Sequence, residues 1–389
     1  MSTATKGSLN AMFSGYGAAM DKTSPFEIFL VATPGLEAPL YAEVVERGFP
    51  EPRLVEGGVT IVGDWHDVWR ANLELRGASR VLARIASFRA MHLAQLDKRA
   101  RRVAWGDYLK PDVPVSVEAV CRRSRIYHSG AAAQRIAKAI SEELGAPISD
   151  GAELAIKARI EDDLVTISID TSGEMLHRRG HKEAVNKAPM RETLASLFLR
   201  QAGYRGGEPV LDPMCGSGTF VIEAAEIAAG LKPGRTRSFA FETLRSFDAE
   251  AWRALREHVP AAAPSLTFFG SDRDAGAIEM SRANAERAGV AGLTRFQQLP
   301  VEEVAVPEGP PGLVIVNPPY GARIGERGGV TPLYRTLGQT LRRFSGWRVA
   351  LITTDKALAN ATGLPFSTPF PPVSHGGIRV NLFVTEPLK

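Results

Sequence analysis

A strand that runs into a glycine loop and continues as a helix narrows the choice of fold more than any other segment of this chain. Residues 210–219 read Val-Leu-Asp-Pro-Met-Cys-Gly-Ser-Gly-Thr, and an apolar helix is expected from residue 220. Gly216 and Gly218 carry no side chain, so the backbone can approach a ligand closely, and Ser217 or Thr219 can cap the helix. The loop has neither the Gly-Lys-Ser/Thr ending of a P-loop nor the third glycine of a Gly-x-Gly-x-x-Gly fingerprint. Pyrophosphate is therefore not the expected ligand.

Strand and helix patterns alternate from residue 207 to the end of the chain. Short apolar runs mark strands near residues 210, 268, 296, 315 and 350, and helical patterns separate them. This alternation predicts an α/β domain whose mostly parallel sheet has helices on both faces. A final strand is expected at 378–385, where a closing hairpin would complete seven strands. An insertion at 230–264 carries four aromatic residues, which we expect to form a local core rather than a lid.

Two of the predicted strands end in polar side chains. Asp272 closes the strand that begins at residue 266, a position where carboxylates of open α/β sheets accept ribose hydroxyls. The alternative is that Asp272 caps the helix that follows. Asn-Pro-Pro-Tyr at 317–320 follows the buried strand 313–316. The side-chain oxygen of Asn317 and the carbonyl of Pro318 can both accept hydrogen bonds from one amino group, and Tyr320 can stack on its plane. The alternative is an ordinary turn, since these residue types are common in loops.

The first half of the chain predicts smaller units that mix strands and helices. Strands are expected at 28–32, 59–62, 80–88, 114–120, 154–160 and 164–169, and helices at 36–47, 66–75 and 130–144. A helix with Pro189 in its first turn is expected to run to Ala202. Residues 1–25 are rich in small and polar side chains and lack a signal-peptide pattern, so we expect a disordered tail.

Composition excludes several classes of protein. The 44% hydrophobic and 23% charged content is ordinary for a globular chain, and no apolar run is long enough to span a membrane. Only Cys121 and Cys215 are present, which favours the reducing cytoplasm over a disulfide scaffold. We interpret Cys215 as a small side chain that fits its loop rather than a nucleophile, because no motif supplies a base. No metal site is expected.

Positive charge is concentrated in one part of the chain. Residues 70–135 contain 14 Lys and Arg against 5 Asp and Glu, a net charge of +9, so the remainder of the +4 chain carries −5. Aromatic residues lie among the basic ones, as is typical of nucleic-acid binding, although a solvated helix face is the alternative. The residues predicted to contact RNA are Arg99, Arg101, Arg102, Arg122, Arg123 and Arg125.

Together these motifs resemble those of the THUMP-containing RNA guanine-N2 methyltransferases, which are class I S-adenosylmethionine-dependent enzymes. The resemblance covers nearly the whole chain from about residue 26. It implies a disordered tail at 1–25, a ferredoxin-like module at 26–75, a THUMP RNA-binding domain of α+β type at 76–170, and a Rossmann-like methyltransferase domain at 171–389. The matching strings lie at 34–37, 57–59, 75–76, 170–173, 176–181, 188–195, 212–223 and 317–323.

The resemblance also implies a cofactor, a substrate and site residues. The cofactor would be S-adenosylmethionine and the substrate RNA, with large-subunit (23S) ribosomal RNA expected before transfer RNA, and the enzyme is expected to be a cytoplasmic monomer. Asn317, Pro318 and Tyr320 would hold the target amine. The residues expected at the cofactor are Asp212, Gly216, Gly218, Thr219, Asp272, Pro189, Glu192 and Thr193.

One position departs from the family pattern, and rival functions remain. Pro300 stands where the pattern leads us to expect an aspartate that binds the adenine amine, so Glu302 or a backbone carbonyl would have to replace that aspartate.

A DNA adenine-N6 or protein glutamine-N5 methyltransferase would use a similar amine clamp. A non-catalytic RNA-binding protein is the rival from another class. The basic first half argues against a protein substrate, and the intact glycine loop argues against a protein without catalytic function.

Overall fold

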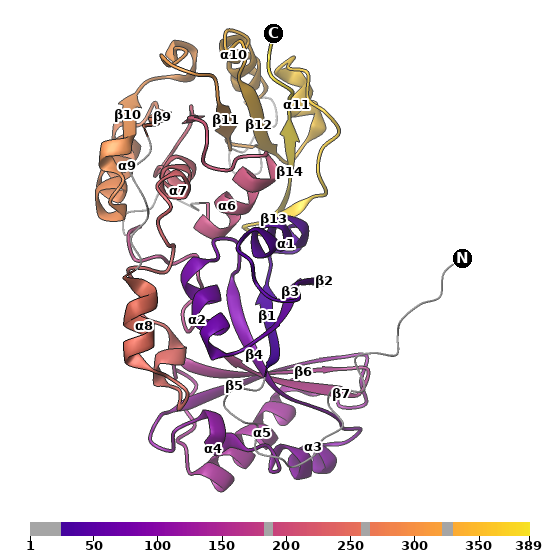
Figure 1. Ribbon diagram of the computed structural model, residues 1–389. Coiled ribbons are helices and arrows are strands. Elements are labelled where there is room, and N and C mark those ends of the chain that lie inside the picture. The colour runs from indigo at the N-terminus through magenta and orange to yellow at the C-terminus, as the bar shows by residue number, and fades with distance from the viewer. Residues whose placement is uncertain (1–24, 183–189, 258–264, 321–329) are drawn as a thin grey trace.

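Two seven-stranded sheets form the framework of the chain. The computed structural model describes residues 25–182, 190–257, 265–320 and 330–389, so residues 1–24 of the expected tail lie outside the described part. Figure 1 shows the two sheets toward opposite ends of an elongated molecule, with the carboxy-terminal half above and the amino-terminal half below. The first sheet is built from residues of the first half of the chain and the second from residues of the second half.

The carboxy-terminal sheet has the strand order β10-β9-β8-β11-β12-β14-β13. Its first five members are parallel, and β14 is antiparallel to both β12 and β13. Seven strands and a closing hairpin were both expected from the sequence, and both are confirmed. The strands are β8 (Val210–Asp212), β9 (Phe268–Asp272), β10 (Thr294–Gln298), β11 (Leu313–Val316), β12 (Arg348–Thr353), β13 (Val373–His375) and β14 (Ile378–Val384).

Helices cover both faces of this sheet, as the alternating pattern predicts. Successive residues of β11 point to opposite faces, because Leu313 and Ile315 join one hydrophobic cluster and Val314 and Val316 join another. The first cluster includes residues of α7 and α9, and the second includes residues of α10. Apart from the insertion, the α-helices of this half are α6 (Glu192–Gln201), α7 (Thr219–Ala228), α9 (Ala275–Ala288), α10 (Thr331–Leu341) and α11 (Lys356–Ala361).

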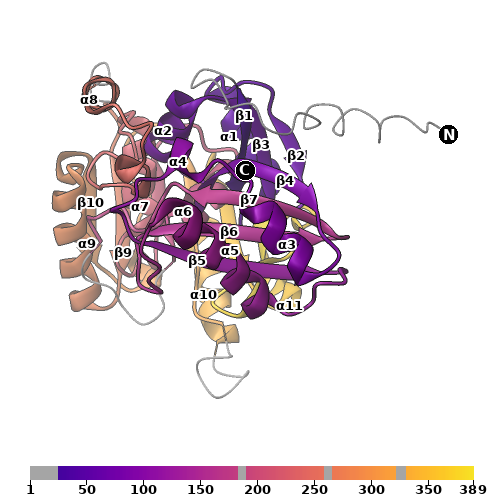
Figure 2. The ribbon, with the colours of Figure 1, turned by 90° about the horizontal axis from the view of Figure 1, so that it is seen from below.

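The amino-terminal sheet has the order β2-β3-β1-β4-β7-β6-β5 and is continuous across the expected module boundary at 75/76. The long strand β4 pairs with β1 through its first residues and with β7 along most of its length. In Figure 2, helices α3 and α5 cross the strands β5, β6 and β7. The strands are β1 (Phe26–Val31), β2 (Arg53–Val55), β3 (Gly58–Gly63), β4 (Arg80–Arg89), β5 (Val115–Arg122), β6 (Leu154–Glu161) and β7 (Leu164–Asp170). The helices are α1 (Glu37–Glu46), α2 (Trp65–Glu74), α3 (Leu93–Ala100), α4 (Trp105–Tyr108) and α5 (Ser129–Leu144).

The insertion after α7 packs against the amino-terminal half through aromatic rings. Trp69 of α2 stacks on Phe241 with ring centroids 6.1 Å apart and meets Phe247 edge-on at 5.9 Å. Phe239 stacks on Phe241 at 5.2 Å, and Trp252 of α8 (Ala249–Arg256) meets Phe241 edge-on at 4.9 Å. The aromatic residues of the insertion therefore form a local core, as predicted, and this core also joins the two halves of the chain.

We predict that Trp69→Ala lowers the free energy of unfolding by about 3–5 kcal/mol, because it removes the tryptophan ring that α2 contributes to this junction and leaves a cavity. Chemical denaturation monitored by circular dichroism measures the change. Tyr127→Ala is the matched control, since 84% of that aromatic side chain is exposed, and surface substitutions usually change stability by less than about 0.5 kcal/mol. Equal losses for the two variants would show that the junction does not contribute to folding.

Candidate active site

Three expected site residues follow three neighbouring strands. Asp272 closes β9, Asp212 closes β8, and Asn317 comes directly after β11, and these strands lie in the order β9-β8-β11. The chain moves outward from β8 to one side through β9 and β10, and to the other through β11 and β12. In open α/β sheets this switch point creates a crevice at the carboxyl ends of the strands, where ligands bind. The structure therefore brings these three side chains to one edge of the sheet.

The glycine loop is held in place by helix α9. Ser281 donates a hydrogen bond from Oγ to the carbonyl of Gly216 at 2.8 Å, and Asn284 donates from Nδ2 to the carbonyl of Ser217 at 3.1 Å. Gly218 has a φ of +83°, and a Cβ atom there would lie 3.1 Å from Ser281. Both the backbone conformation and the close helix therefore require glycine at this position.

The start of α7 differs from the expectation in one respect. Gly218 occupies the N-cap position, and no described side chain caps the helix there, so capping by Ser217 or Thr219 was wrong. The hydroxyl of Thr219 instead accepts a hydrogen bond from Lys182. The first amide groups of α7 therefore have no side-chain cap among the described residues and can meet a ligand.

Asp272 supports the loop and faces the crevice edge. Its Oδ2 accepts the amide hydrogen of Gly216 and its Oδ1 that of Asp274, each at 3.0 Å. Asp274, and not Asp272, is the residue that caps α9, so the helix-cap alternative for Asp272 is wrong. A carboxylate has about four acceptor positions, so two remain for other donors.

Asp212 is almost fully buried, and this changes its acidity. Burial raises the pKa of its carboxyl to about 8, the hydrogen bond from the amide of Met214 (3.0 Å) opposes the shift, and the charge of Asp272 adds to it. The group is therefore protonated at pH 7 unless a positive charge lies beside it. Burial also raises the pKa of the neighbouring Cys215 thiol, so that residue stays a neutral thiol and agrees with its interpretation as a packing residue.

Asn317 carries an unused acceptor. Its Oδ1 is buried and has no hydrogen-bond partner in the described part of the chain. A buried polar atom without a partner costs about 1–3 kcal/mol, so this oxygen fits a donor supplied from outside. Pro318 is buried, Pro319 is exposed, and the Tyr320 side chain is only 4% exposed. A base could stack on Tyr320 only if its ring became more exposed than in this structure.

A narrow cavity behind the glycine loop connects the loop with the start of α6. Glu192 and Thr193 open α6 and are both buried, whereas Pro189 lies outside the described residues. Lys182 donates from Nζ to the carbonyl of Met190 at 2.7 Å and to Oγ1 of Thr219 at 2.8 Å, and it lies 3.4 Å from Oε1 of Glu192. The cavity is lined by His181, Lys182, Glu192, Ser217, Thr219, Ile222, Glu223 and Asn284.

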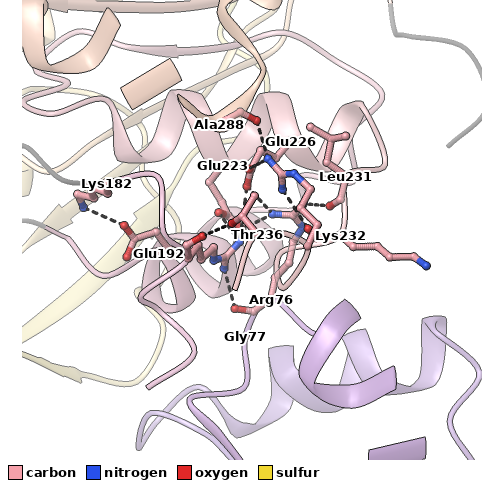
Figure 3. Close-up of polar contacts among 12 residues, drawn as sticks. Arg76, Gly77, Lys182, Glu192, Glu223, Glu226, Leu231, Lys232, Thr236 and Ala288 are labelled. Carbon is pink, nitrogen blue, oxygen red and sulfur yellow. Dashed lines mark hydrogen bonds and ion pairs between the residues drawn. The ribbon is translucent and has the colours of Figure 1, made fainter. Parts of the chain in front are cut away.

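A buried ion cluster also holds α7, as Figure 3 shows. Nη1 of Arg76 lies 2.9 Å from Glu223 and 3.2 Å from Glu226, two residues of α7. Nη1 of Arg179 lies 2.8 Å from Glu223, and Nη2 of Arg235 lies 2.6 Å from Glu226. Burial opposes ionisation of Glu226, but the charges of Arg76 and Arg235 lower its pKa to about 2. These arginines come from the amino-terminal half, the segment between β7 and α6, and the insertion, so all three segments are fixed to the helix that follows the glycine loop.

Sequence reasoning missed Lys182 and this ion cluster. The signal was present in the sequence, because Glu223 and Glu226 are acidic residues inside an otherwise apolar helix, where partners are required. The sequence does not identify those partners, since they are more than 40 residues away for Arg179 and about 150 for Arg76.

The arginines expected to bind RNA fall into two groups. Arg102 and Arg122 are exposed, and Arg99 is partly buried. The other three are held by carboxylates of the chain, which reduces the charge available to a phosphate backbone. The pairs are Arg101 with Asp97 (3.0 Å), Glu142 (2.5 Å) and Glu143 (3.0 Å), Arg123 with Glu161 (2.7 Å) and Asp162 (3.2 Å), and Arg125 with Asp163 (3.9 Å).

The expected contact with the cofactor's adenine stays a prediction. Pro300 precedes a short 3₁₀ helix at Val301–Glu303, and Glu302 is exposed there.

Among the described residues, no group of three His, Cys, Asp or Glu side chains could hold a metal ion. Within the same ranges, no helix combines the length and apolarity needed to cross a bilayer.

Comparison with protein families matches both halves of the chain. The family model described as the RMKL-like methyltransferase domain matches residues 179–368, and the model of the RlmL ferredoxin-like domain matches residues 27–82. A Synechocystis protein named provisionally as an RNA methyltransferase is 31% identical over 94% of this chain and 97% of its own length. The ribosomal RNA large subunit methyltransferase K/L of Methylococcus capsulatus is 34% identical over 92% of this chain. The chain spans about half (51%) of that relative's length.

Solved structures show the same architecture over nearly the whole chain. A possible methylase of Clostridium difficile 630 superposes with a TM-score of 0.85 at 29% identity, covering 94% of this chain and 99% of that one. SMU.472, provisionally a methyltransferase, was solved with S-adenosylhomocysteine and also gives 0.85, at 26% identity and the same coverage. The strand order, glycine loop and acidic strand end define a class I methyltransferase that uses S-adenosylmethionine. The chain belongs to the RMKL-like methyltransferase family, with the RlmL-type ferredoxin-like domain at its amino-terminal end.

We predict that Asp212→Asn removes a pH dependence from the stability of the free protein. The folded state holds the Asp212 proton more tightly than the unfolded chain, because its pKa is raised from 3.8 to about 8. The wild-type protein should therefore lose stability relative to the variant as pH rises from 4 to 8, by up to about 1.4 kcal/mol per pH unit. Denaturation of both proteins at pH 5, 6, 7 and 8 measures the difference. A difference that does not change with pH would contradict the raised pKa.

Proposed function

We propose that this enzyme methylates the exocyclic N2 amine of guanine in RNA, with 23S ribosomal RNA as the first expected substrate and transfer RNA as the second. The observation that carries the proposal is the buried Oδ1 of Asn317 at the switch point of the sheet, which has no hydrogen-bond partner among the described residues. An acceptor in this place is suited to an amine hydrogen that only a bound substrate supplies.

The residues around the crevice fit the cofactor. Asp272 keeps acceptor positions for the ribose hydroxyls, and Gly216 and Gly218 leave room for the chain of atoms beside them. The Asp212 carboxyl would face the cofactor's α-ammonium group, whose charge favours the ionised carboxylate. Glu192 and Thr193 would lie at the same end, at the start of α6. The bound cofactor supplies an activated methyl group on a sulfonium sulfur.

The amine clamp positions the acceptor. Oδ1 of Asn317 and the carbonyl of Pro318 would accept the two hydrogens of the guanine amine, which directs the nitrogen lone pair toward the methyl group. Tyr320 would stack on the base and hold it in that plane. These contacts act through orientation and through electrostatic stabilisation of the amine as it becomes positive. A strong base is not required, because the amine proton becomes acidic once the methyl group has transferred.

The target base has to be accessible. An exocyclic amine inside a duplex cannot reach a crevice at the edge of a sheet, so the guanine would be unpaired or flipped out of its helix. We propose that residues 76–170 act as a THUMP domain, after a ferredoxin-like module at 26–75 and before the methyltransferase domain at 171–389. Arg102 and Arg122, the members of the predicted RNA-contacting set that are exposed and take no part in the ion pairs described above, would bind the phosphate backbone.

The names of relatives support RNA, and one neighbour names a rival. The K/L relatives are named as ribosomal RNA large subunit methyltransferases. A Listeria monocytogenes structure with a TM-score of 0.83 and 31% identity is described as a predicted N6-adenine-specific DNA methylase. The adenine-N6 amine would fit the same clamp, so methylation of DNA adenine is the second candidate. The basic amino-terminal half, which a small-molecule or protein substrate would not need, favours a nucleic acid in either case.

We predict that Asn317→Ala lowers kcat by about 100-fold or more, because the variant loses an acceptor aimed at the developing charge. S-adenosylmethionine binding, measured by calorimetry, should stay within a few-fold of the wild-type value, since Asn317 holds the acceptor and not the cofactor. The measurement is transfer of a radiolabelled methyl group to ribosomal RNA. Turnover at the wild-type rate in this variant would refute the clamp.

We predict that the double variant Arg102→Ala, Arg122→Ala binds RNA more weakly and with a flatter salt dependence. Each lost phosphate contact should reduce the slope of log K against log salt by about 0.7–0.9. Arg101→Ala is the control within the same surface, because its guanidinium is already engaged by three carboxylates. The idea fails if the control loses as much affinity as the double variant in a filter-binding titration between 50 and 200 mM salt.

A further inference from the structure

Lys182 is a buried cation that lies beside the amino-terminal ends of two helices, where a positive charge is unfavourable. Its side chain is 9% exposed, and its ammonium lies at Thr219, the first residue of α7, and at Met190, just before α6. The amino-terminal end of each helix carries the equivalent of about half a positive charge, so a cation there is repelled. Glu192 neutralises the lysine but leaves the partial charges of the two helix ends uncompensated.

The three donors of the ammonium group are all used. One donates to the Met190 carbonyl, one to the Thr219 hydroxyl, and the third points to Glu192. The contacts join the segment before α6 to the glycine-loop helix, across the cavity that Lys182 and Thr219 line together. Lys182 therefore fixes the relative position of two elements that the proposed function places at the amino-acid end of the cofactor.

We propose that Lys182 is a positioning residue for the cofactor, which holds the starts of α6 and α7 apart at the spacing that accepts the carboxylate of the cofactor's amino-acid moiety. The inference rests on the proposed cofactor contacts of Thr219, Glu192 and Asp212. An anionic group at this point is favoured by both helix ends and by the nearby ammonium. The ammonium group of the same moiety would meet Asp212, so the two charges of the zwitterion would be recognised at different places.

Two ligands separate this role from a general effect on folding. S-adenosylhomocysteine carries the amino-acid moiety, whereas 5′-methylthioadenosine has the same nucleoside and thioether but lacks the carboxylate. For Lys182→Met we expect S-adenosylhomocysteine to bind about tenfold more weakly or worse, and 5′-methylthioadenosine to bind within about twofold of wild type. The thermal midpoint of the free variant should fall by less than about 8 °C, because burial raises the pKa of the Glu192 carboxyl, which can take up a proton once Lys182 no longer lies beside it.

Lys232→Met is the matched control. Lys232 also donates to a backbone carbonyl, that of Leu255, but it lies in the insertion. It should leave the affinities for both ligands unchanged. Lys182→Gln, which keeps two N–H donors and loses the charge, should reproduce the ligand selectivity of Lys182→Met.

Each outcome has a defined meaning. Equal weakening of both ligands, a loss of the thermal midpoint by more than about 8 °C in both Lys182 variants, or wild-type affinity for S-adenosylhomocysteine would overturn the inference. If the wild-type protein itself failed to bind S-adenosylhomocysteine, the cofactor site of the proposed function would be wrong, a result distinct from the failure of Lys182 alone.

Discussion

The buried contact between Arg76, Arg179 and the two glutamates of α7 is the interaction on which the site depends. Removing one partner from such a cluster leaves an unpaired charge in a dry environment and typically costs about 3–5 kcal/mol. Glu223 lies one turn and Glu226 two turns beyond Thr219, the residue that opens α7 and ends the glycine loop. The position of the loop is therefore tied to the amino-terminal sheet as well as to its own sheet.

This arrangement explains how a substrate-binding half can serve a distant crevice. The aromatic junction at Trp69 and the ion cluster hold the two halves through side chains far apart in the sequence. If the first half binds RNA as proposed, these contacts would present that RNA to the crevice at a set distance. In the proposed function, the orientation of the substrate would follow from the rigidity of the junction, and the chemistry would follow from acceptors at the ends of β8, β9 and β11.

The charges in the crevice suit a zwitterionic, cationic cofactor. Asp212 keeps its proton in the free protein and would lose it beside an ammonium group, which links cofactor binding to proton release. Lys182 and the helix ends supply positive potential on the other side. Negative potential at one end of the crevice and positive potential at the other would orient the bound cofactor, and this orientation needs no contact with the methyl group.

Much of this could be read from the sequence because the relevant residues are close together along the chain. The strand–loop–helix at 210–220 and the polar ends at Asp272 and Asn317 follow local rules, and the structure places them together. The expected capping of α7 by Ser217 or Thr219 was wrong, since the Thr219 hydroxyl accepts from a lysine that local patterns do not reveal. The prediction of RNA contacts at the basic stretch came from counting charges. Arg101 and Arg123 pair with carboxylates of other elements, and these pairs depend on tertiary packing that a charge count does not reveal. Long-range ion pairs are set by the fold and cannot be obtained from spacing.

The most direct test of the account is to identify the modified nucleoside. The purified enzyme would be incubated with unmodified 23S ribosomal RNA and S-adenosylmethionine carrying a deuterated methyl group, and the digested nucleosides would be analysed by mass spectrometry. The account predicts that the label appears in N2-methylguanosine and that Asn317→Ala removes it. Label in N6-methyladenosine, or in no nucleoside while the cofactor remains bound, would contradict it.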